Sequence, residues 1–276
     1  MAAAAYQITY SEQDGLCADC SSPRCGLAAS DREICWICPA EFGEGRLFKI
    51  NVRSGIDIWI TDCRFETGMV FSCLEYPAVV IFSFYLSGQA KSRLGCSNTS
   101  LAPVQGQQGI FYFPQPVGSS QVEAHTEFRH VAIMVQPGHL AGYFEEDLNL
   151  LPQGLRRIVQ ERSETPFCRI GEISPPMISA LQQILHCPYR GMTRRLYLES
   201  RVMALIAFQL EGLSPDAGRK KTPGILHPSD RRCIEEVRQL LVHDLENPPD
   251  LKALTRRAGM SHTKLNRCFR QLYGVT

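Results

Sequence analysis

The strongest constraint on the fold lies near the C-terminal end of the sequence, where residues 250–274 predict two short helices joined by a tight turn. Asp250 is suited to cap the first of these helices. Its apolar residues recur at spacings of three and four, at Leu251, Leu254 and Ala258. Gly259 and Met260 interrupt the pattern, and Ser261 is suited to cap the second helix. The segment therefore predicts a helix-turn-helix.

The second predicted helix has two distinct faces. Its apolar stripe consists of Leu265, Cys268, Phe269 and Leu272. A recognition helix contacts base edges with outward residues near its N-terminus, where Asn pairs with adenine and Arg with guanine. We therefore expect contacts to double-stranded DNA, with bases through Thr263, Asn266 and Arg267 and with phosphates through His262, Lys264 and Arg270. The alternative is a helical hairpin with a solvated basic face.

Charge and composition divide the chain into two parts. The whole chain has 29 Lys and Arg against 28 Asp and Glu, but the segment from Arg219 to Thr276 alone carries +6. Such a basic segment indicates a nucleic-acid partner, and the alternative is a surface that only keeps the protein in solution. Residues 213–228 lack apolar periodicity and are predicted to be a linker. Residues 229–276 are predicted to be a partial DNA-binding domain, with a supporting helix whose apolar stripe is Ile234, Val237, Leu240, Leu241 and Leu245.

Residues 47–136 contain short runs of β-forming residues separated by turn residues. The expected strands are Leu47–Val52, Ile56–Arg64, Met69–Glu75, Val79–Leu86, Gly109–Pro114, Gln121–His125 and His130–Val135. Together with the later helices they predict an α+β chain whose N-terminal part is a small β-barrel or a double-sheet jelly roll. Aromatic side chains in this part either fill the core or line a ligand pocket.

Residues 137–212 predict a helical segment, with helices near Pro176–Cys187 and Met192–Glu211. The second helix has a long apolar stripe formed by Leu196, Val202, Leu205, Ile206 and Gln209. Such a face either closes the β domain or pairs with a second copy in a homodimer, and both alternatives stay open at this point.

Residues 1–46 form a cysteine-rich segment in a chain that has 12 cysteines. Five of them are close in sequence, as two Cys-X-X-Cys pairs with one cysteine between them: Cys17, Cys20, Cys25, Cys35 and Cys38. Thiolates at this spacing are able to converge on Zn²⁺ or on an iron–sulfur cluster. A reversible thiol switch and inert cysteines are the alternatives. The other seven cysteines lie in apolar patterns and are expected to be small core residues.

Several stretches resemble a known family. Leu-Thr-Arg-Arg-Ala-Gly-Met-Ser at 254–261 and Lys-Leu-Asn-Arg-Cys-Phe-Arg-Gln-Leu-Tyr-Gly at 264–274 resemble the first helix-turn-helix of AraC-family transcription regulators. Residues 193–205, the polar linker and the helix ending in Leu-Glu-Asn-Pro-Pro-Asp at 245–250 are similar to the PchR branch, whose members respond to ferri-pyochelin. Residues 79–91 fit this branch more loosely. The resemblance covers most of the chain from about Val79 onward.

The resemblance implies a cupin-like effector domain, dimerising helices and two helix-turn-helix units joined by a long helix. The sequence ends at Val275-Thr276, where that helix is expected to begin, so we expect only the first unit here. The implied function is effector-responsive DNA binding, with an iron–siderophore complex in the barrel or a signal at the cysteines. The alternative is a metal- or redox-sensing binding module without a role on DNA.

The sequence offers no set of residues typical of an enzyme. It has no Ser/His/Asp order, no Gly-rich phosphate loop and no paired-carboxylate motif. The His-X-His run with which cupin enzymes bind a metal is missing, because His125 and His130 are isolated. The N-terminus lacks the pattern of a signal peptide, and no stretch reaches membrane-spanning length. We therefore expect a cytoplasmic protein that is not an enzyme and has no membrane partner.

Overall fold

The structure is a computed structural model of the chain. It describes residues 6–11, 15–18, 27–30, 33–75, 78–94, 99–114, 118–144, 148–160, 163–213, 228–243 and 249–273. Side chains are described only from residue 33 onward, and within the helices and strands after it some, such as those of Arg267 and Arg270, are outside the description. The chain has both sheets and helices, as the α+β prediction requires, with the strands before the helices.

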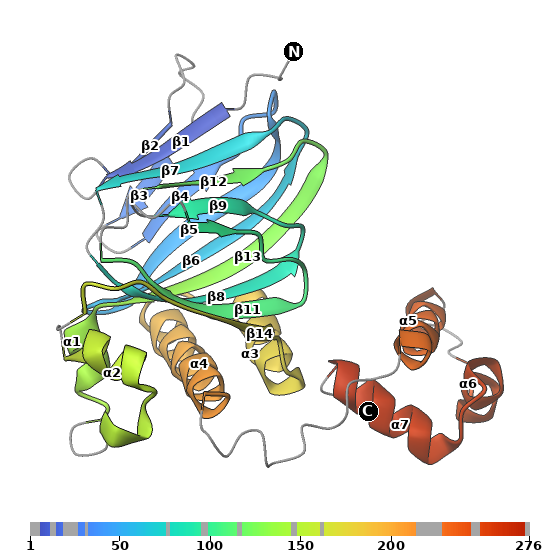
Figure 1. Cartoon of the computed structure of the whole chain (residues 1–276). Coiled ribbons are helices and arrows are strands. Elements are labelled where there is room, and N and C mark those ends of the chain that lie inside the picture. The colour runs from blue at the N-terminus through green and yellow to red at the C-terminus, as the bar shows by residue number, and fades with distance from the viewer. Residues whose placement is uncertain are drawn as a thin grey trace.

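Two sheets face each other in the N-terminal part of the chain (Figure 1). The six-stranded sheet has the order β10 (Thr99–Leu101), β9 (Lys91–Leu94), β12 (Gly118–Val122), β7 (Met69–Glu75), β1 (Tyr6–Ser11) and β2 (Gly15–Ala18). The eight-stranded sheet has the order β14 (Phe167–Glu172), β11 (Gln107–Tyr112), β8 (Val80–Ser87), β13 (Thr126–Val135), β6 (Ile56–Phe65), β5 (Gly43–Arg53), β4 (Glu33–Ile37) and β3 (Leu27–Ser30). Neither sheet closes on itself among the described strands, so the closed-barrel alternative is wrong.

Alternate residues of a strand point to opposite faces of its sheet, so the eight-stranded sheet contributes side chains to two separate cores. One face packs on helices in a sheet–helix core, to which β6 contributes Ile56, Ile58 and Ile60. The other face packs on the six-stranded sheet in an inter-sheet core. The buried members of the inter-sheet core are Trp36, Cys38, Leu47, Cys63, Phe65, Met69, Tyr85, Ala90, Val122 and Phe128.

Helices cover the outer face of the eight-stranded sheet (Figure 1). They are α1 (Pro137–Ala141), a 3-10 turn at Leu148–Leu150, α2 (Gln153–Val159), α3 (Pro175–Leu185) and α4 (Gly191–Glu211). The two helices expected from the sequence are therefore present as α3 and α4. The expected stripe of α4 is largely buried in the sheet–helix core, through Val202, Leu205 and Ile206. Most of this face therefore closes the β domain.

Two expected segment boundaries need correction. Residues 1–46 are not a segment apart from the β domain, because β1 to β4 belong to the two sheets. Residues 137–212 are not purely helical, because β14 lies within them and pairs antiparallel with β11. The pairing of β1 with β7 and that of β14 with β11 are long-range, and local sequence patterns do not report such pairing.

Three helices follow the predicted linker: α5 (Pro228–His243), α6 (Leu251–Ala258) and α7 (His262–Tyr273). They share a core of their own, whose buried members are Ile234, Val237, Leu254, Ala258, Met260, Leu265 and Cys268. Residues 214–227 of the predicted linker lie outside the described residues. Among the described helices, none is both long and apolar enough to cross a membrane.

Candidate functional site

The helix-turn-helix forms through the caps that the sequence predicts. The Asp250 side chain accepts a hydrogen bond of 2.6 Å from the Ala253 backbone N–H and so caps α6. At the other end of α6, Gly259 adopts a left-handed conformation with φ of 61°. The Ser261 hydroxyl accepts a hydrogen bond from the Lys264 backbone N–H, over 3.3 Å, at the start of α7. Local hydrogen bonds therefore stabilise the end of α6 and the start of α7.

We predict that Gly259→Ala destabilises the α5–α7 unit by about 1–2 kcal/mol, because a residue with a Cβ is strained in the left-handed region. A Cβ at this position would meet no heavy atom within 4 Å, so the loss comes from the backbone and not from a clash. Gly259→Asn is the matched control, because Asn tolerates this conformation better. Thermal unfolding of the unit should rank Gly above Asn above Ala. Equal stability of the Ala and Asn variants would contradict this origin of the loss.

The outward face of α7 carries the residues expected to contact DNA. His262 and Thr263 are exposed, whereas Lys264 and Asn266 are half-buried. The Asn266 side-chain amide lies 3.1 Å from Nε2 of His262, one turn earlier on the same face. Arg267 and Arg270 also lie on α7, and their side chains are outside the described part of the structure. The structure thus brings His262 and Asn266 together, while contacts of any of these residues with DNA stay predictions.

A polar pair formed by a buried serine and a half-buried histidine lies on the inner face of the eight-stranded sheet. Ser83 on β8 is 2% exposed, and its hydroxyl shares a 2.6 Å hydrogen bond with Nε2 of His130 on β13. The His130 ring packs 4.5 Å from the ring of Tyr85 and 5.7 Å from that of Phe128. Both aromatic residues belong to the inter-sheet core, so the pair lies within the double-sheet domain.

Burial shifts the pKa values of His130 and Tyr85. It lowers the pKa of His130 to about 4, because the enclosed ring loses the solvation of its charged form. Burial also raises the pKa of Tyr85, and a hydrogen bond with Ser83 opposes this shift. The interior of the domain therefore presents a neutral imidazole and two hydroxyl groups near neutral pH. Such groups orient a bound ligand by hydrogen bonds without placing a charge in the core.

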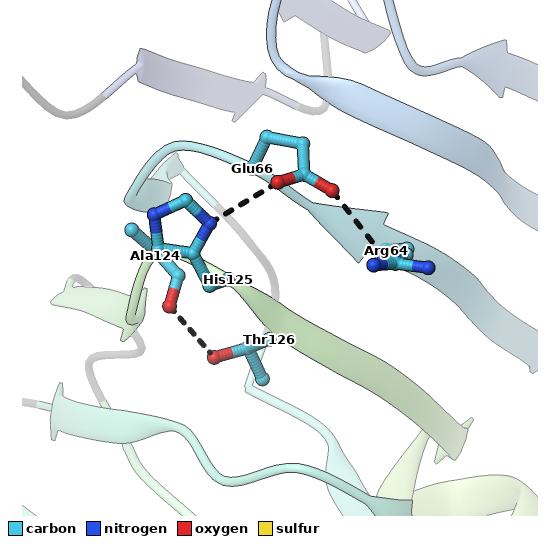
Figure 2. A network of polar contacts seen from close by, with 5 residues as sticks. All are labelled: Arg64, Glu66, Ala124, His125 and Thr126. Atoms are coloured by element: carbon cyan, nitrogen blue, oxygen red, sulfur yellow. Dashed lines mark hydrogen bonds and ion pairs between the residues drawn. The ribbon is translucent and has the colours of Figure 1, made fainter.

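His125 lies in a different environment (Figure 2). It occupies the turn before β13 with φ of 55°, and its Nδ1 lies 3.1 Å from Oε2 of Glu66. Glu66 also forms an ion pair of 3.3 Å with Arg64, and all three side chains are exposed to solvent. His125 and His130 therefore have separate hydrogen-bond partners and do not share a site.

The cysteines of the N-terminal segment are only partly described. Cys20 and Cys25 lie outside the described residues, as does the side chain of Cys17 on β2. Cys38 packs in the inter-sheet core beside Trp36. Cys35 is next to Trp36 on β4 and so faces the opposite side of the sheet. The structure thus does not bring Cys35 and Cys38 together.

Burial makes the thiols of Cys35 and Cys63 weaker acids. Burial raises the pKa of Cys35 and, more strongly, that of Cys63. The charges of Cys38 and Asp62 raise the pKa of Cys63 further. Across the residues described, no group of three or more His, Cys, Asp or Glu side chains is arranged to hold a metal ion. A metal or cluster held by the expected set of cysteines stays a prediction.

The last turn of α4 is anchored to the sheet by a buried polar side chain. The Gln209 amide donates hydrogen bonds to the Gly109 carbonyl oxygen, at 3.2 Å, and to Oε1 of Gln108. At the other end of α4, Leu196 is exposed although we expected it in the apolar stripe. A homodimer through this helix stays a prediction.

In comparisons with known proteins, one family model matches most of the chain. A family model described as the regulatory protein PchR N-terminal domain matches residues 44–225. The regulatory protein PchR of Pseudomonas aeruginosa is 36% identical over 104 residues, which are 37% of this chain and 35% of that protein. The aligned part thus spans about a third of the relative's length.

Two solved structures of regulators are similar at a low level. One is the AraC-like transcriptional activator CuxR, with 9% identity, a TM-score of 0.36, and coverage of 88% of this chain and 79% of that chain. The other is an apo form of a single-residue variant of ToxT from Vibrio cholerae, with 9% identity, a TM-score of 0.39, and coverage of 79% and 93%. These scores are too low to support a structural argument.

Proposed function

The chain belongs to the family of the regulatory protein PchR N-terminal domain, and on this premise we propose that it is an effector-responsive, DNA-binding transcriptional regulator. The family consists of regulatory proteins and not of enzymes. The observation that carries the proposal is the helix-turn-helix, capped at Asp250, Gly259 and Ser261, which follows a domain of this family in the same chain.

The double-sheet domain is the proposed cupin-like sensor. Support comes from the Ser83–His130 pair, which places hydrogen-bonding groups among the aromatic side chains of the inter-sheet core. We propose that a small effector binds beside this pair. An iron–siderophore complex is the proposed class of effector, on the basis of the resemblance of this sequence to the PchR branch.

The route from sensor to DNA is proposed to run through α4. Its last turn is tied to β11 by Gln209 and directly precedes the predicted linker. A ligand that changes the packing of the sheets would bias how this helix holds the linker, and so the fraction of molecules competent to bind DNA.

DNA recognition is proposed for the outward face of α7. Thr263, Asn266 and Arg267 are the proposed base contacts, and His262, Lys264 and Arg270 the proposed phosphate contacts. Support comes from the exposure of His262 and Thr263 and from the shared face of His262 and Asn266. A single small module makes few phosphate contacts, so we expect weak and strongly salt-dependent binding.

The test compares two substitutions on a duplex selected by this protein from random sequence and on a scrambled duplex, by fluorescence anisotropy. Arg267→Ala should weaken binding to the selected duplex by roughly 10–100-fold and binding to the scrambled duplex much less, because it removes a base contact. Lys264→Ala is the matched control and should weaken both equally, with a salt slope lower by about 1. Repeating the titration with ferric pyochelin tests the effector.

Two outcomes would refute the proposal in different ways. An equal loss on both duplexes for Arg267→Ala would remove its base-reading role and leave DNA binding intact. The absence of any salt-dependent binding to either duplex would argue for a binding module that does not act on DNA.

A further inference from the structure

A pocket of 780 Å³ lies between one edge of the eight-stranded sheet and the start of α4. The sheet contributes Glu33 from β4 and Ile50 from β5, and the helix side contributes Tyr189 and Met192. This volume is in the range of small-molecule sites. The pocket is distinct from the inter-sheet region around Ser83 and His130, because it opens on the helix-covered side of the sheet.

The charge of the lining is strongly positive. Arg190, Arg194 and Arg195 line the pocket together with a single carboxylate, that of Glu33. Arg194 Nη1 lies 2.5 Å from Oε1 of Glu33, so the protein itself already places a carboxylate against one of these arginines. Arg guanidinium groups bind carboxylates through paired hydrogen bonds, and this chemistry favours an anionic ligand.

Apart from Asn51 and Gly191, the rest of the lining is apolar or aromatic and includes large exposed side chains. Met192 is 73% exposed and Tyr189 is 45% exposed, while Ile50 is almost fully buried at the sheet. The Tyr189 ring lies edge-on to the Tyr197 ring, with the two centroids 5.0 Å apart, and this contact favours its orientation before any ligand arrives. An apolar ligand body would cover these side chains, which water otherwise contacts.

We propose that this pocket binds a small organic anion that has an aromatic body and one carboxylate. The ring of the ligand packs on Tyr189 and Met192, and its carboxylate pairs with Arg190 and Arg195. Because Glu33 already occupies Arg194, the ligand carboxylate also competes with Glu33 for that arginine. Binding therefore acts on the link between β4 and α4. This site goes beyond the proposed DNA-binding function, since the ligand binds whether or not the protein is a regulator.

The test is isothermal titration calorimetry on the whole chain without DNA, with 2-naphthoate as the probe. We expect 2-naphthoate to bind at least about tenfold more tightly than the neutral 2-naphthamide, because charge-assisted bonds to arginine are lost in the amide. The double variant Arg190→Ala/Arg195→Ala should bind 2-naphthoate with an affinity lower by about tenfold or more. Arg157→Ala on α2, an exposed arginine outside the pocket, is the control and should leave the affinity unchanged.

Glu33→Gln tests whether the Glu33 carboxylate opposes binding of the ligand carboxylate. It should tighten 2-naphthoate binding, because Arg194 loses its internal carboxylate partner. Equal affinity for the acid and the amide, or undiminished binding by the double arginine variant, would overturn the site. Absence of 2-naphthoate binding would overturn it as well, including the case in which sedimentation shows that a second copy of the chain covers the pocket. None of these results bears on DNA binding, so the two proposals fail independently.

Discussion

Leu265→Ala should lower the free energy of unfolding of the α5–α7 unit by about 2–5 kcal/mol, the usual range for truncating a buried leucine. Leu265 is 2% exposed and packs with Ile234 and Leu254 in the core of this unit. A unit this small buries little apolar surface and has little stability to lose. We therefore expect a large fraction of it to be unfolded, with loss of DNA binding, while the double-sheet domain keeps its stability.

Hydrogen exchange followed by mass spectrometry resolves the two parts of the chain. Amides of α6 and α7 should exchange much faster in the variant, and amides of the eight-stranded sheet should be unchanged. Leu251→Ala is the matched control, because Leu251 begins α6 but is 43% exposed, and we expect a loss within about 0.5 kcal/mol. Unchanged protection of α6 and α7 in Leu265→Ala would show that this core does not hold the unit together.

The helix-turn-helix could be predicted from sequence because its determinants are local. Asp250 and Ser261 each bond to a backbone N–H three residues away, and Gly259 provides the left-handed turn between the helices. Each of these residues stabilises the backbone next to it, and its effect does not depend on residues far away in the sequence. The apolar spacing then placed Leu254 and Leu265 correctly in the core.

Cys35 and Cys38 show what a Cys-X-X-Cys spacing does not report, namely the direction of the side chains. This spacing suggested converging thiolates, although Cys35 and Cys38 lie at or next to a strand. An offset of three residues in extended chain puts side chains on opposite faces. The apolar residues Ile34 and Trp36, two positions apart, were the available evidence for a strand with one buried face.

The strands that sequence reasoning missed are polar, short or exposed. Residues of β14 are mostly exposed, so the strand lacks the alternation that marks a half-buried one. Its place at the end of the eight-stranded sheet depends on pairing with β11, far away in the sequence. The short strand β9 likewise owes its position to pairing with β12, and β10 joins the sheet only through β9. Non-local pairing of this kind has no local signature.

Of the Ser83–His130 pair, only the inward direction of His130 could be predicted from the sequence. Alternation along β13 places His130 on the same face as Phe128, which points inward. Its partner Ser83 is 47 residues away and meets it only because β8 and β13 are neighbours in the sheet. The chemical consequence, a neutral histidine in the core, therefore required the fold.

The stability of the double-sheet domain should fall as the pH falls from about 6.5 to about 4, and His130 should account for roughly 2–3 kcal/mol of this loss. Its pKa is about 4 in the folded chain, because burial penalises the charged ring, and 6.5 in a solvated chain. Between these values the unfolded chain binds a proton that the folded chain does not. Protonation thus favours unfolding, and the contribution of His130 is fully present only above pH 6.5.

His130→Gln isolates this contribution from that of carboxylates titrating in the same range. The amide can keep a hydrogen bond to Ser83 but does not ionise, so the variant should lose less stability than the unaltered chain as the pH falls. The measurement is urea unfolding of both proteins at pH 7, 5.5 and 4.5, with the difference between them taken at each pH. If the His130→Gln profile is instead parallel to that of the unaltered chain, the His130 ring is not the group that links the stability of this domain to pH.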